Sequence, residues 1–131
     1  MKTNVLIIGG GLAGLSLAWQ LQKRGFDYQL IEARARFGGR VDAHDIGTDT
    51  DTPTRSFDTG PAWFWPGQLR IAEAIDELGL QIFEQYALGD VIFEDEAGRT
   101  QRGRGYSSMK GSLRLKGSLQ KLIEGIKMRL P

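Results

Sequence analysis

The chain has 131 residues, of which 40% are hydrophobic and 25% are charged, and these proportions are typical of one globular domain. Seventeen basic and sixteen acidic residues give a formal net charge of +1, so no general field attracts nucleic acid or an anionic membrane. The absence of cysteine and the single histidine, His44, exclude disulfide frameworks, thiolate zinc sites and histidine-rich metal clusters. No run approaches the roughly 18 apolar residues that a membrane span needs, and we expect a soluble, cytoplasmic protein.

The first thirty residues have the pattern of a β-α-β unit. Asn4 to Ile8 is a short apolar run ended by Gly9, which is typical of a strand buried on both faces. Leu12 to Lys23 predicts a helix, and Tyr28 to Ile31 predicts a second strand. The buried side of the helix is predicted to contain Gly14, Leu17, Ala18 and Leu21. Crossovers of this kind make the two strands parallel.

A glycine motif lies between the first strand and the helix. Gly9, Gly11 and Gly14 form G-x-G-x-x-G, in which glycine allows a tight turn, close approach of a pyrophosphate and close packing of helix on strand. Leu12 and Ala13 open the helix, whose N-terminal N–H groups and dipole favour phosphates. The motif therefore predicts a dinucleotide site; the alternatives are a glycine-rich turn without a ligand and a signal peptide.

Glu32 follows the second strand directly, eighteen residues after Gly14. A carboxylate at this position can accept hydrogen bonds from both ribose hydroxyls and would repel a 2′-phosphate, so NADP is disfavoured. The glycine turn and Glu32 together leave FAD and NAD as alternatives.

The segment that begins at Glu32 favours FAD. Its pattern, E-A-R-x-R-x-G-G-R from Glu32 to Arg40, resembles the signature of the flavin amine oxidase superfamily, whose cofactor is FAD. The resemblance implies that Arg34 lies beside the adenosine ribose, next to Ala33, and that Arg40 contacts the pyrophosphate. It also implies that Gly38 and Gly39 bring the backbone close to the cofactor. The alternatives are a solvated basic loop and a nucleic-acid patch, and the near-neutral total charge argues against the patch.

A second segment resembles the same family. Asp58 to Trp63 matches D-x-G-x-x-W, whose backbone runs beside the isoalloxazine ring in that family. The resemblance implies flavin contacts from Gly60, Pro61, Ala62 and Trp63. The alternative is that Trp63, Phe64 and Trp65 are core aromatics of a small domain.

The rest of the chain predicts further short elements. His44 to Arg55 has no hydrophobic periodicity and indicates a surface loop, whereas Leu69 to Leu78 predicts a helix. Two strands are expected at Gln81 to Gln85 and Val91 to Glu94, a hairpin turn at Asp95 to Gly98 leads into Arg99 to Arg104, and a last helix begins near Ser118. The predicted fold is α/β: residues 1–78 form a Rossmann-like FAD-binding unit with a parallel sheet. Residues 79–131 then begin a substrate domain with a β-hairpin and a return helix.

Three weaker patterns indicate no site. Asp49 and Asp51 suggest calcium, but the EF-hand glycine and the distal glutamate are missing. His44 has no identifiable nucleophile as partner. Ser107, Ser108 and Ser112 lie in a flexible connection that lacks the P-loop spacing. We predict no metal site.

By resemblance the chain is the N-terminal portion of an FAD-dependent oxidoreductase that oxidises an amine or a related small molecule. The lysine that often lies near the flavin N5 in this family belongs to a later part, so no catalytic residue is predicted. The isolated chain is expected to be too short for activity. The alternatives are a non-catalytic NAD- or FAD-binding module and one half of a split flavoprotein, with a second polypeptide or a homo-oligomer as partner. Because a small parallel sheet needs cover on both faces, we expect marginal stability of the chain alone.

Overall fold

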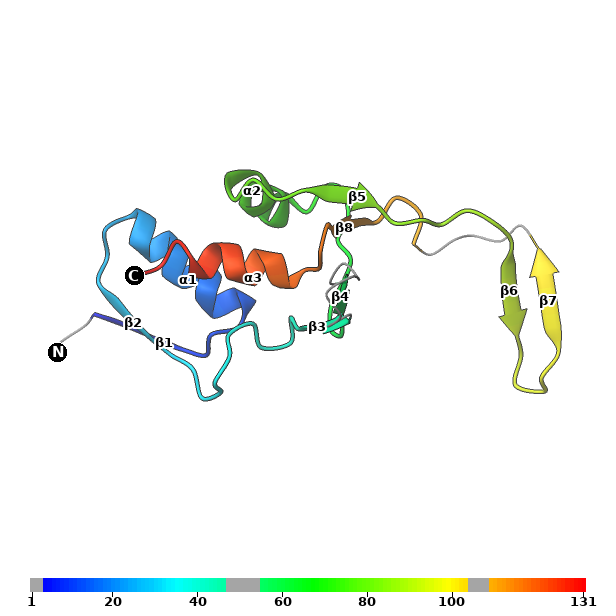
Figure 1. The fold of residues 1–131 in the computed structure, drawn as a ribbon, viewed down its shortest axis with the longest axis horizontal. Helices are drawn as coiled ribbons and strands as arrows, with labels where there is room; N and C mark the ends of the chain where they lie inside the picture. Colours follow the sequence, from blue (N-terminus) through cyan, green and yellow to red (C-terminus); the bar gives the residue numbers. More distant parts are fainter. Residues whose placement is uncertain (1–3, 47–54, 104–108) are drawn as a thin grey trace.

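The computed structural model describes residues 4–46, 55–103 and 109–131. It begins with strand β1 (Val5–Ile8), helix α1 (Leu12–Lys23) and strand β2 (Tyr28–Ile31), as the sequence predicts. The two strands are parallel, with Val5 opposite Tyr28 and Ile8 opposite Ile31. The predicted β-α-β unit is therefore confirmed, and Figure 1 shows α1 lying alongside the β1–β2 pair.

Helix α1 ends where predicted but buries a different stripe. Gly25, with a φ of +70°, follows the helix, and its N–H donates to the carbonyl of Gln22. The buried residues are Leu15, Ala18 and Trp19, whereas Leu17 is 47% exposed. The predicted stripe was wrong at Leu17 because α3 packs on the side of Leu15 and Trp19, and the short helical pattern could not specify that neighbour.

A hairpin replaces part of the predicted loop from His44 to Arg55. Strand β3 (Ala43–Ile46) pairs antiparallel with β4 (Arg55–Asp58). The loop interpretation was wrong at both ends, since the pairing depends on backbone hydrogen bonds that polar, non-alternating sequence does not reveal. Residues 47–54, with Asp49 and Asp51, lie outside the described residues, as do Ser107 and Ser108.

The second half contains a helix, two strand pairs and a final helix. Helix α2 (Leu69–Glu77) and α3 (Gln120–Lys127) agree with the prediction, and β6 (Val91–Glu94) forms the predicted hairpin with β7 (Thr100–Gly103). Strand β5 (Ile82–Glu84) pairs antiparallel with β8 (Leu113–Leu115), which the sequence analysis missed. Its short L-R-L pattern lies in a polar passage that gives no recognisable strand signal.

The core lies where α3 returns to α1. Leu15 of α1 and Leu122, Ile123 and Ile126 of α3 are each 1% exposed. A Cβ on Gly125 would lie 3.1 Å from the Leu78 side chain, which shows how closely α3 approaches the end of α2. In Figure 1 α3 runs beside α1. Residues from both ends of the chain thus form one core.

Two surfaces carry exposed apolar side chains. Leu6, Ile8 and Ile31, on one side of the β1–β2 pair, are 53%, 80% and 44% exposed. The β6–β7 hairpin projects from the body in Figure 1, and every residue of both its strands is exposed. Among the described residues, no helix is long and apolar enough to cross a membrane.

Candidate nucleotide-binding site

The glycine turn after β1 has the conformation that its motif requires. Gly9 has a φ of +103°, and its N–H donates to the carbonyl of Ile31 at 2.8 Å, which connects the turn to β2. A Cβ on Gly14 would clash with the carbonyl oxygen of Gly9. Gly11 has more space, with its nearest neighbour, Gly39, 3.8 Å from an added Cβ. Gly14 therefore permits helix–strand contact, and Gly11 leaves its surface free for a ligand.

Gly10 is a glycine whose importance the motif does not reveal. A Cβ on Gly10 would clash with the aromatic ring of Phe37, because that ring packs directly over the turn. Sequence reasoning assigned no role to either residue. The sequence signal for Gly10 was that it makes Gly9 to Gly11 a run of three glycines, one more than the motif requires at this point.

The N-terminus of α1 faces this turn. Gly11 precedes the helix in an extended conformation, and among the described residues no side chain caps it. The first N–H groups of a helix have no intrahelical acceptor, so those of Leu12 and Ala13 remain available to an anion. Leu12 is half-buried and Ala13 is exposed. The geometry suits a phosphate group.

Glu32 is fixed beside the turn by two backbone hydrogen bonds. Its Oε1 accepts the N–H of Arg34 at 2.8 Å, and its Oε2 accepts the N–H of Gly10 at 2.7 Å. These bonds, that of Arg34 first, hold the pKa of the Glu32 carboxyl below its usual value. Each oxygen keeps a further lone pair, so an ionised Glu32 can still accept hydroxyl hydrogen bonds.

The loop after β2 closes onto the glycine turn. The N–H of Gly38 donates to the carbonyl of Gly10 at 2.9 Å, and Gly38 forms an isolated β-bridge with Gly11. A Cβ on Gly39 would lie 3.2 Å from the Cα of Gly11. Gly38 and Gly39 have φ angles of +112° and +62°, which glycine adopts without strain. The two glycine clusters therefore form one backbone-lined surface.

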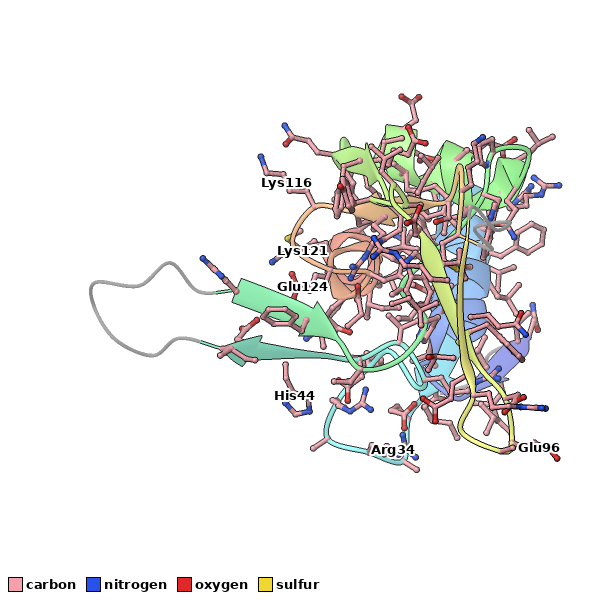
Figure 2. All side chains as sticks on the ribbon, turned by 90° about the vertical axis from the view of Figure 1, so that its right-hand side faces the viewer. Arg34, His44, Glu96, Lys116, Lys121 and Glu124 are labelled. Atoms are coloured by element: carbon pink, nitrogen blue, oxygen red, sulfur yellow. The ribbon has the colours of Figure 1, made fainter. Side chains whose placement is uncertain are left out.

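Three arginines of this loop have different environments. Arg36 donates from Nη2 to the carbonyl of Gly39 at 3.1 Å and forms an ion pair with Asp42 at 3.2 Å. Arg34 and Arg40 are exposed, and Figure 2 labels Arg34 on the loop that follows β2. The sequence analysis assigned Arg34 and Arg40 to the ligand and left Arg36 without a role. In the structure Arg36 stabilises the loop through its contacts with Gly39 and Asp42.

The segment from Gly60 to Trp63 runs against the same loop. The N–H of Thr59 donates to the carbonyl of Asp42 at 3.0 Å, and a Cβ on Gly60 would clash with the carbonyl of Arg40. Ala62 is buried, Pro61 is exposed and Trp63 is 43% exposed.

The aromatic residues of this segment divide between core and surface. Phe64 is buried in the hydrophobic core, whereas Trp63 and Trp65 are 43% and 41% exposed. The core interpretation is therefore correct for Phe64 and wrong for the two tryptophans.

An apolar pocket of about 480 Å³ extends from the N-terminus of α1 to this segment. Leu12 lines it at the helix, Val41 and Leu119 line it from the core, and Pro61 and Trp63 line it from the segment after β4. This volume lies within the usual range of roughly 300 to 1,000 Å³ for small-molecule pockets. The pocket thus adjoins both predicted contact regions.

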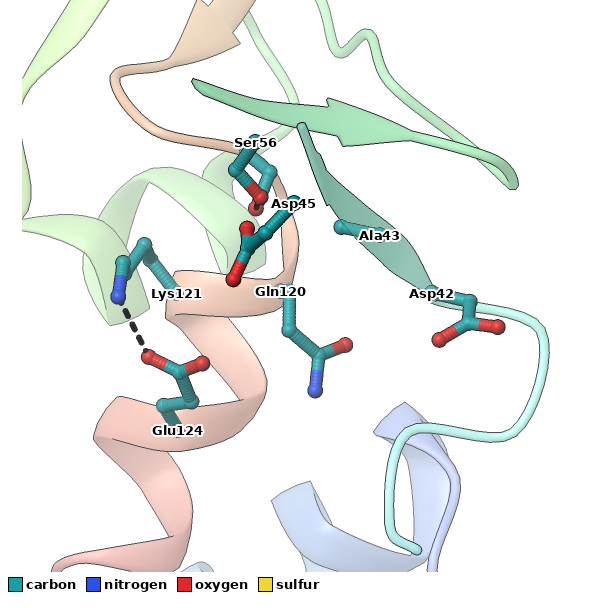
Figure 3. A pocket seen from close by; sticks show the side chains of 8 residues that line it. Asp42, Ala43, Asp45, Ser56, Gln120, Lys121 and Glu124 are labelled. Atoms are coloured by element: carbon teal, nitrogen blue, oxygen red, sulfur yellow. Dashed lines mark hydrogen bonds and ion pairs between the residues drawn. The ribbon is translucent and has the colours of Figure 1, made fainter. Parts of the chain in front are cut away.

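A second, polar pocket of about 250 Å³ lies between β3 and α3 (Figure 3). Asp42, Asp45 and Glu124 line it together with Lys121, whose Nζ donates to Glu124 at 2.8 Å. This hydrogen bond raises the pKa of Lys121. In the part of the chain that the structure describes, no group of three or more acidic or histidine residues is arranged to hold a metal ion.

Comparison with known proteins identifies the family of the chain. The profile of the family described as "NAD(P)-binding Rossmann-like domain" matches residues 7–78, more than half of the chain. The chain belongs to this family. Its matched region contains the glycine turn, Glu32 and the segment from Gly60 to Trp63.

The relatives found by sequence include amine oxidases. The chain is 29% identical over 119 residues to a probable flavin-containing monoamine oxidase A from Dictyostelium discoideum, which covers 91% of this chain and 25% of the relative. It is 32% identical over 94 residues to putrescine oxidase from Kocuria rosea, covering 71% of this chain and 18% of that protein. The chain thus spans a quarter or less of these relatives.

Solved structures give the same result. Putrescine oxidase bound to putrescine superposes with a TM-score of 0.67 at 34% identity, covering 80% of this chain and 22% of that one. Cyclohexylamine oxidase from Brevibacterium oxydans has a TM-score of 0.67 at 27% identity, covering 78% and 22%. A fatty acid isomerase from P. acnes has a TM-score of 0.55 at 25% identity, covering 76% and 22%. The resemblance to flavin amine oxidases is confirmed, and the Rossmann-like fold extends to a protein with a different activity.

Proposed function

We propose that this chain binds FAD and forms the FAD-binding portion of a flavin-dependent enzyme that oxidises an amine or a related small molecule. The observation that carries the proposal is the position of Glu32, hydrogen-bonded to Gly10 at 2.7 Å beside a turn that Gly38 closes. The Glu32 carboxylate, which would bind the ribose, then adjoins a helix N-terminus and a glycine-lined surface, as a dinucleotide requires.

Each predicted residue has a role that agrees with its environment. Glu32 would accept the ribose hydroxyls, and the exposed guanidinium of Arg40 would donate to the pyrophosphate. The remaining contacts of the ADP half would come from Gly9, Gly11, Leu12, Ala13, Gly14, Ala33, Arg34, Gly38 and Gly39. FAD is favoured over NAD because the relatives are named flavin-containing and because the chain matches E-A-R-x-R-x-G-G-R.

The apolar pocket between Leu12 and Trp63 would receive the isoalloxazine ring. Pro61 and Trp63 line it, and Gly60 and Ala62 of the same segment would complete this wall, with Leu12 at the end next to the pyrophosphate. Bound FAD supplies an acceptor for a hydride equivalent from the substrate, and the residues of this chain bind and orient it. No residue of this chain is proposed as catalytic.

The substrate and the remaining chemistry would depend on further polypeptide. Residues 1–78 would form the FAD-binding unit, and residues 79–131 would begin the substrate domain. The additional part would be a covalent continuation, a second polypeptide or a further copy of the chain. The amine class follows from putrescine oxidase and cyclohexylamine oxidase, whereas the fatty acid isomerase shows that this fold also serves other substrates.

A second candidate is a nucleotide-binding module without catalysis. The family is described as NAD(P)-binding, and the chain spans 25% or less of its relatives, so binding alone is consistent with both observations. NAD would use the glycine turn and Glu32 without the segment from Gly60 to Trp63. The two candidates therefore differ in whether the flavin half contributes to affinity.

Titration of the purified chain with FAD, ADP and NAD, followed by calorimetry and by the visible spectrum, tests both candidates. FAD is expected to bind more tightly than NAD, with a perturbed flavin spectrum. A chain that binds NAD but not FAD would contradict the FAD proposal and support the module.

The Glu32→Ala variant tests the ribose contact. We expect it to weaken FAD binding roughly 10- to 100-fold, because a charge-assisted hydrogen bond is lost. Glu96→Ala, in the turn of the β6–β7 hairpin (Figure 2), is the matched control and should leave the affinity unchanged. Equal affinities for both variants would remove Glu32 from the site.

A further inference from the structure

Asp58 is a buried carboxylate two residues before the proposed flavin wall, which begins at Gly60. Its side chain is 2% exposed. Oδ1 accepts the N–H of Leu119 at 2.7 Å, and Oδ2 accepts from Nη2 of Arg114 at 3.1 Å. Asp58 thus connects the end of β4 with β8 and with the start of α3. A buried carboxylate of this kind persists only where its partners are fixed.

The residue before Leu119 indicates how firmly this connection is held. Ser118 is 3% exposed and has a φ of +140°, which side-chain-bearing residues rarely adopt. Its Oγ lies 3.2 Å from Oγ of Ser56 on β4. Strained backbone of this type persists when its surroundings determine it, and here Asp58 binds the next N–H along the chain.

Arg114, which is hydrogen-bonded to Asp58, also contacts Trp63. Its guanidinium carbon lies 5.9 Å from the Trp63 ring centre and 6.0 Å from that of Phe83, within the range of a cation–π contact for both rings. Nε1 of the same indole donates to Oε1 of Gln85 at 3.1 Å. The Trp63 ring is therefore held by a cation and by a hydrogen bond.

The other end of the segment is also fixed. Phe64 and Leu113 exchange two backbone hydrogen bonds, with N–H to carbonyl distances of 3.0 and 2.7 Å. The four residues from Gly60 to Trp63 thus lie between the anchor at Asp58 and the anchor at Phe64.

We propose that Asp58 and Arg114 are positioning residues that set the Gly60–Trp63 wall for the isoalloxazine ring, acting through Trp63 and through the start of α3. This inference rests on the proposed function, because it assigns the wall to the flavin. Neither residue is proposed to touch the adenosine half, which would bind at the glycine turn and Glu32. Their loss should therefore affect the two halves of FAD unequally.

The test compares FAD with ADP, which lacks the flavin half. In Asp58→Asn we expect roughly 10-fold weaker FAD binding, because the charge-assisted bonds are lost, while ADP binding stays within about twofold. Asp90→Asn, which breaks the exposed ion pair with Arg102, is the matched control and should leave both affinities unchanged. Binding is measured by calorimetry on the full chain.

Arg114→Lys is the second variant, and it carries the same comparison if Asp58→Asn fails to fold. It keeps a cation for Asp58 but removes the planar group from Trp63, so FAD affinity and the bound flavin spectrum should change while ADP affinity does not. Amide hydrogen exchange at Leu119 and Phe64, measured without ligand, should be faster in Asp58→Asn than in Asp90→Asn.

The outcomes separate the positioning role from general structural damage. Equal losses of FAD and ADP affinity, or no loss of either, would overturn the positioning role, even with FAD bound normally by the unmodified chain. Failure of the unmodified chain to bind FAD would instead contradict the proposed function before any variant is compared, and would remove the flavin wall with it.

Discussion

In the nucleotide-site region, backbone groups that are far apart in the sequence bind one another, whereas the β6–β7 hairpin is held by local contacts. The carbonyl of Gly10 accepts the N–H of Gly38, and the N–H of Gly10 donates to Glu32, so three segments meet at one turn. In the hairpin, Oδ1 of Asp95 accepts the N–H groups of Ala97 and Arg99 within the same turn. The first region therefore depends on the tertiary fold, whereas the hydrogen bonds of the hairpin turn join residues that are close in the sequence.

The two regions also differ in how far their apolar side chains are exposed. Leu15 beneath the site is 1% exposed, whereas Ile92 and Phe93 on the hairpin are 68% and 60% exposed. A two-stranded hairpin is marginal in water without further cover. The glycine turn therefore lies on a packed core, whereas the hairpin exposes apolar side chains that no neighbouring element covers among the described residues.

Removing a core side chain next to the site should have the largest effect. Leu122→Ala is expected to lower the free energy of unfolding by about 2 to 5 kcal/mol, because it leaves a cavity in the α1–α3 core. The matched control, Ile92→Ala on the hairpin, should change it by less than about 0.5 kcal/mol. Urea unfolding measures both. Comparable losses would show that the hairpin packs as part of the core.

A glycine substitution should give the next largest effect. Gly14→Ala is expected to cost about 1 to 3 kcal/mol and to weaken ADP binding, because the new methyl group would clash with the Gly9 carbonyl. Gly103→Ala on β7 is the matched control, since an added Cβ there meets nothing within 4 Å. Thermal unfolding with and without ADP measures both. A tolerated Gly14→Ala would show that the turn can open without loss.

Acid should produce the smallest effect, and it should reach both regions. Backbone N–H groups, that of Arg34 or that of Arg99 first, lower the pKa of Glu32 in the site and of Asp95 in the hairpin. A carboxyl with a lowered folded-state pKa contributes stability above its unfolded-state pKa, and this is lost as the pH falls through the folded-state value. We therefore expect a modest loss of stability below about pH 4.

Two variants assign this acid response to its region. Glu32→Gln should reduce the pH dependence of the urea midpoint. Asp95→Asn should reduce the pH dependence of amide exchange rates in the hairpin. Urea midpoints and exchange rates between pH 3 and pH 7 provide the measurement. An unchanged profile in Glu32→Gln would contradict a stabilising role for its two backbone hydrogen bonds.

Local patterns were sufficient for the elements whose signal is contained in a few neighbouring residues. The β1–α1–β2 unit followed from an apolar run and phased glycines, and the β6–β7 hairpin followed from Asp95 to Gly98. Helices α2 and α3 followed from their apolar stripes. In each case the residues that determine the element lie within it.

The sequence did not reveal features that depend on a distant partner. Strand β8 exists because it pairs with β5, and β3 exists because it pairs with β4 across residues 47–54. The clash that restricts Gly10 comes from Phe37, and the burial of Asp58 comes from Arg114 and Leu119. The distance along the sequence between these contacting residues does not match any known sequence motif.

The two hydrogen bonds of Glu32 have a consequence for the kinetics of the proposed nucleotide binding. The N–H groups of Arg34 and Gly10 already orient the carboxylate, so the proposed ribose contact would need no prior closure of the loop. We expect nucleotide association to be a single step without a slow conformational phase, since a required conformational change is what slows association. Differences in affinity among nucleotides would arise mainly from how slowly each one leaves.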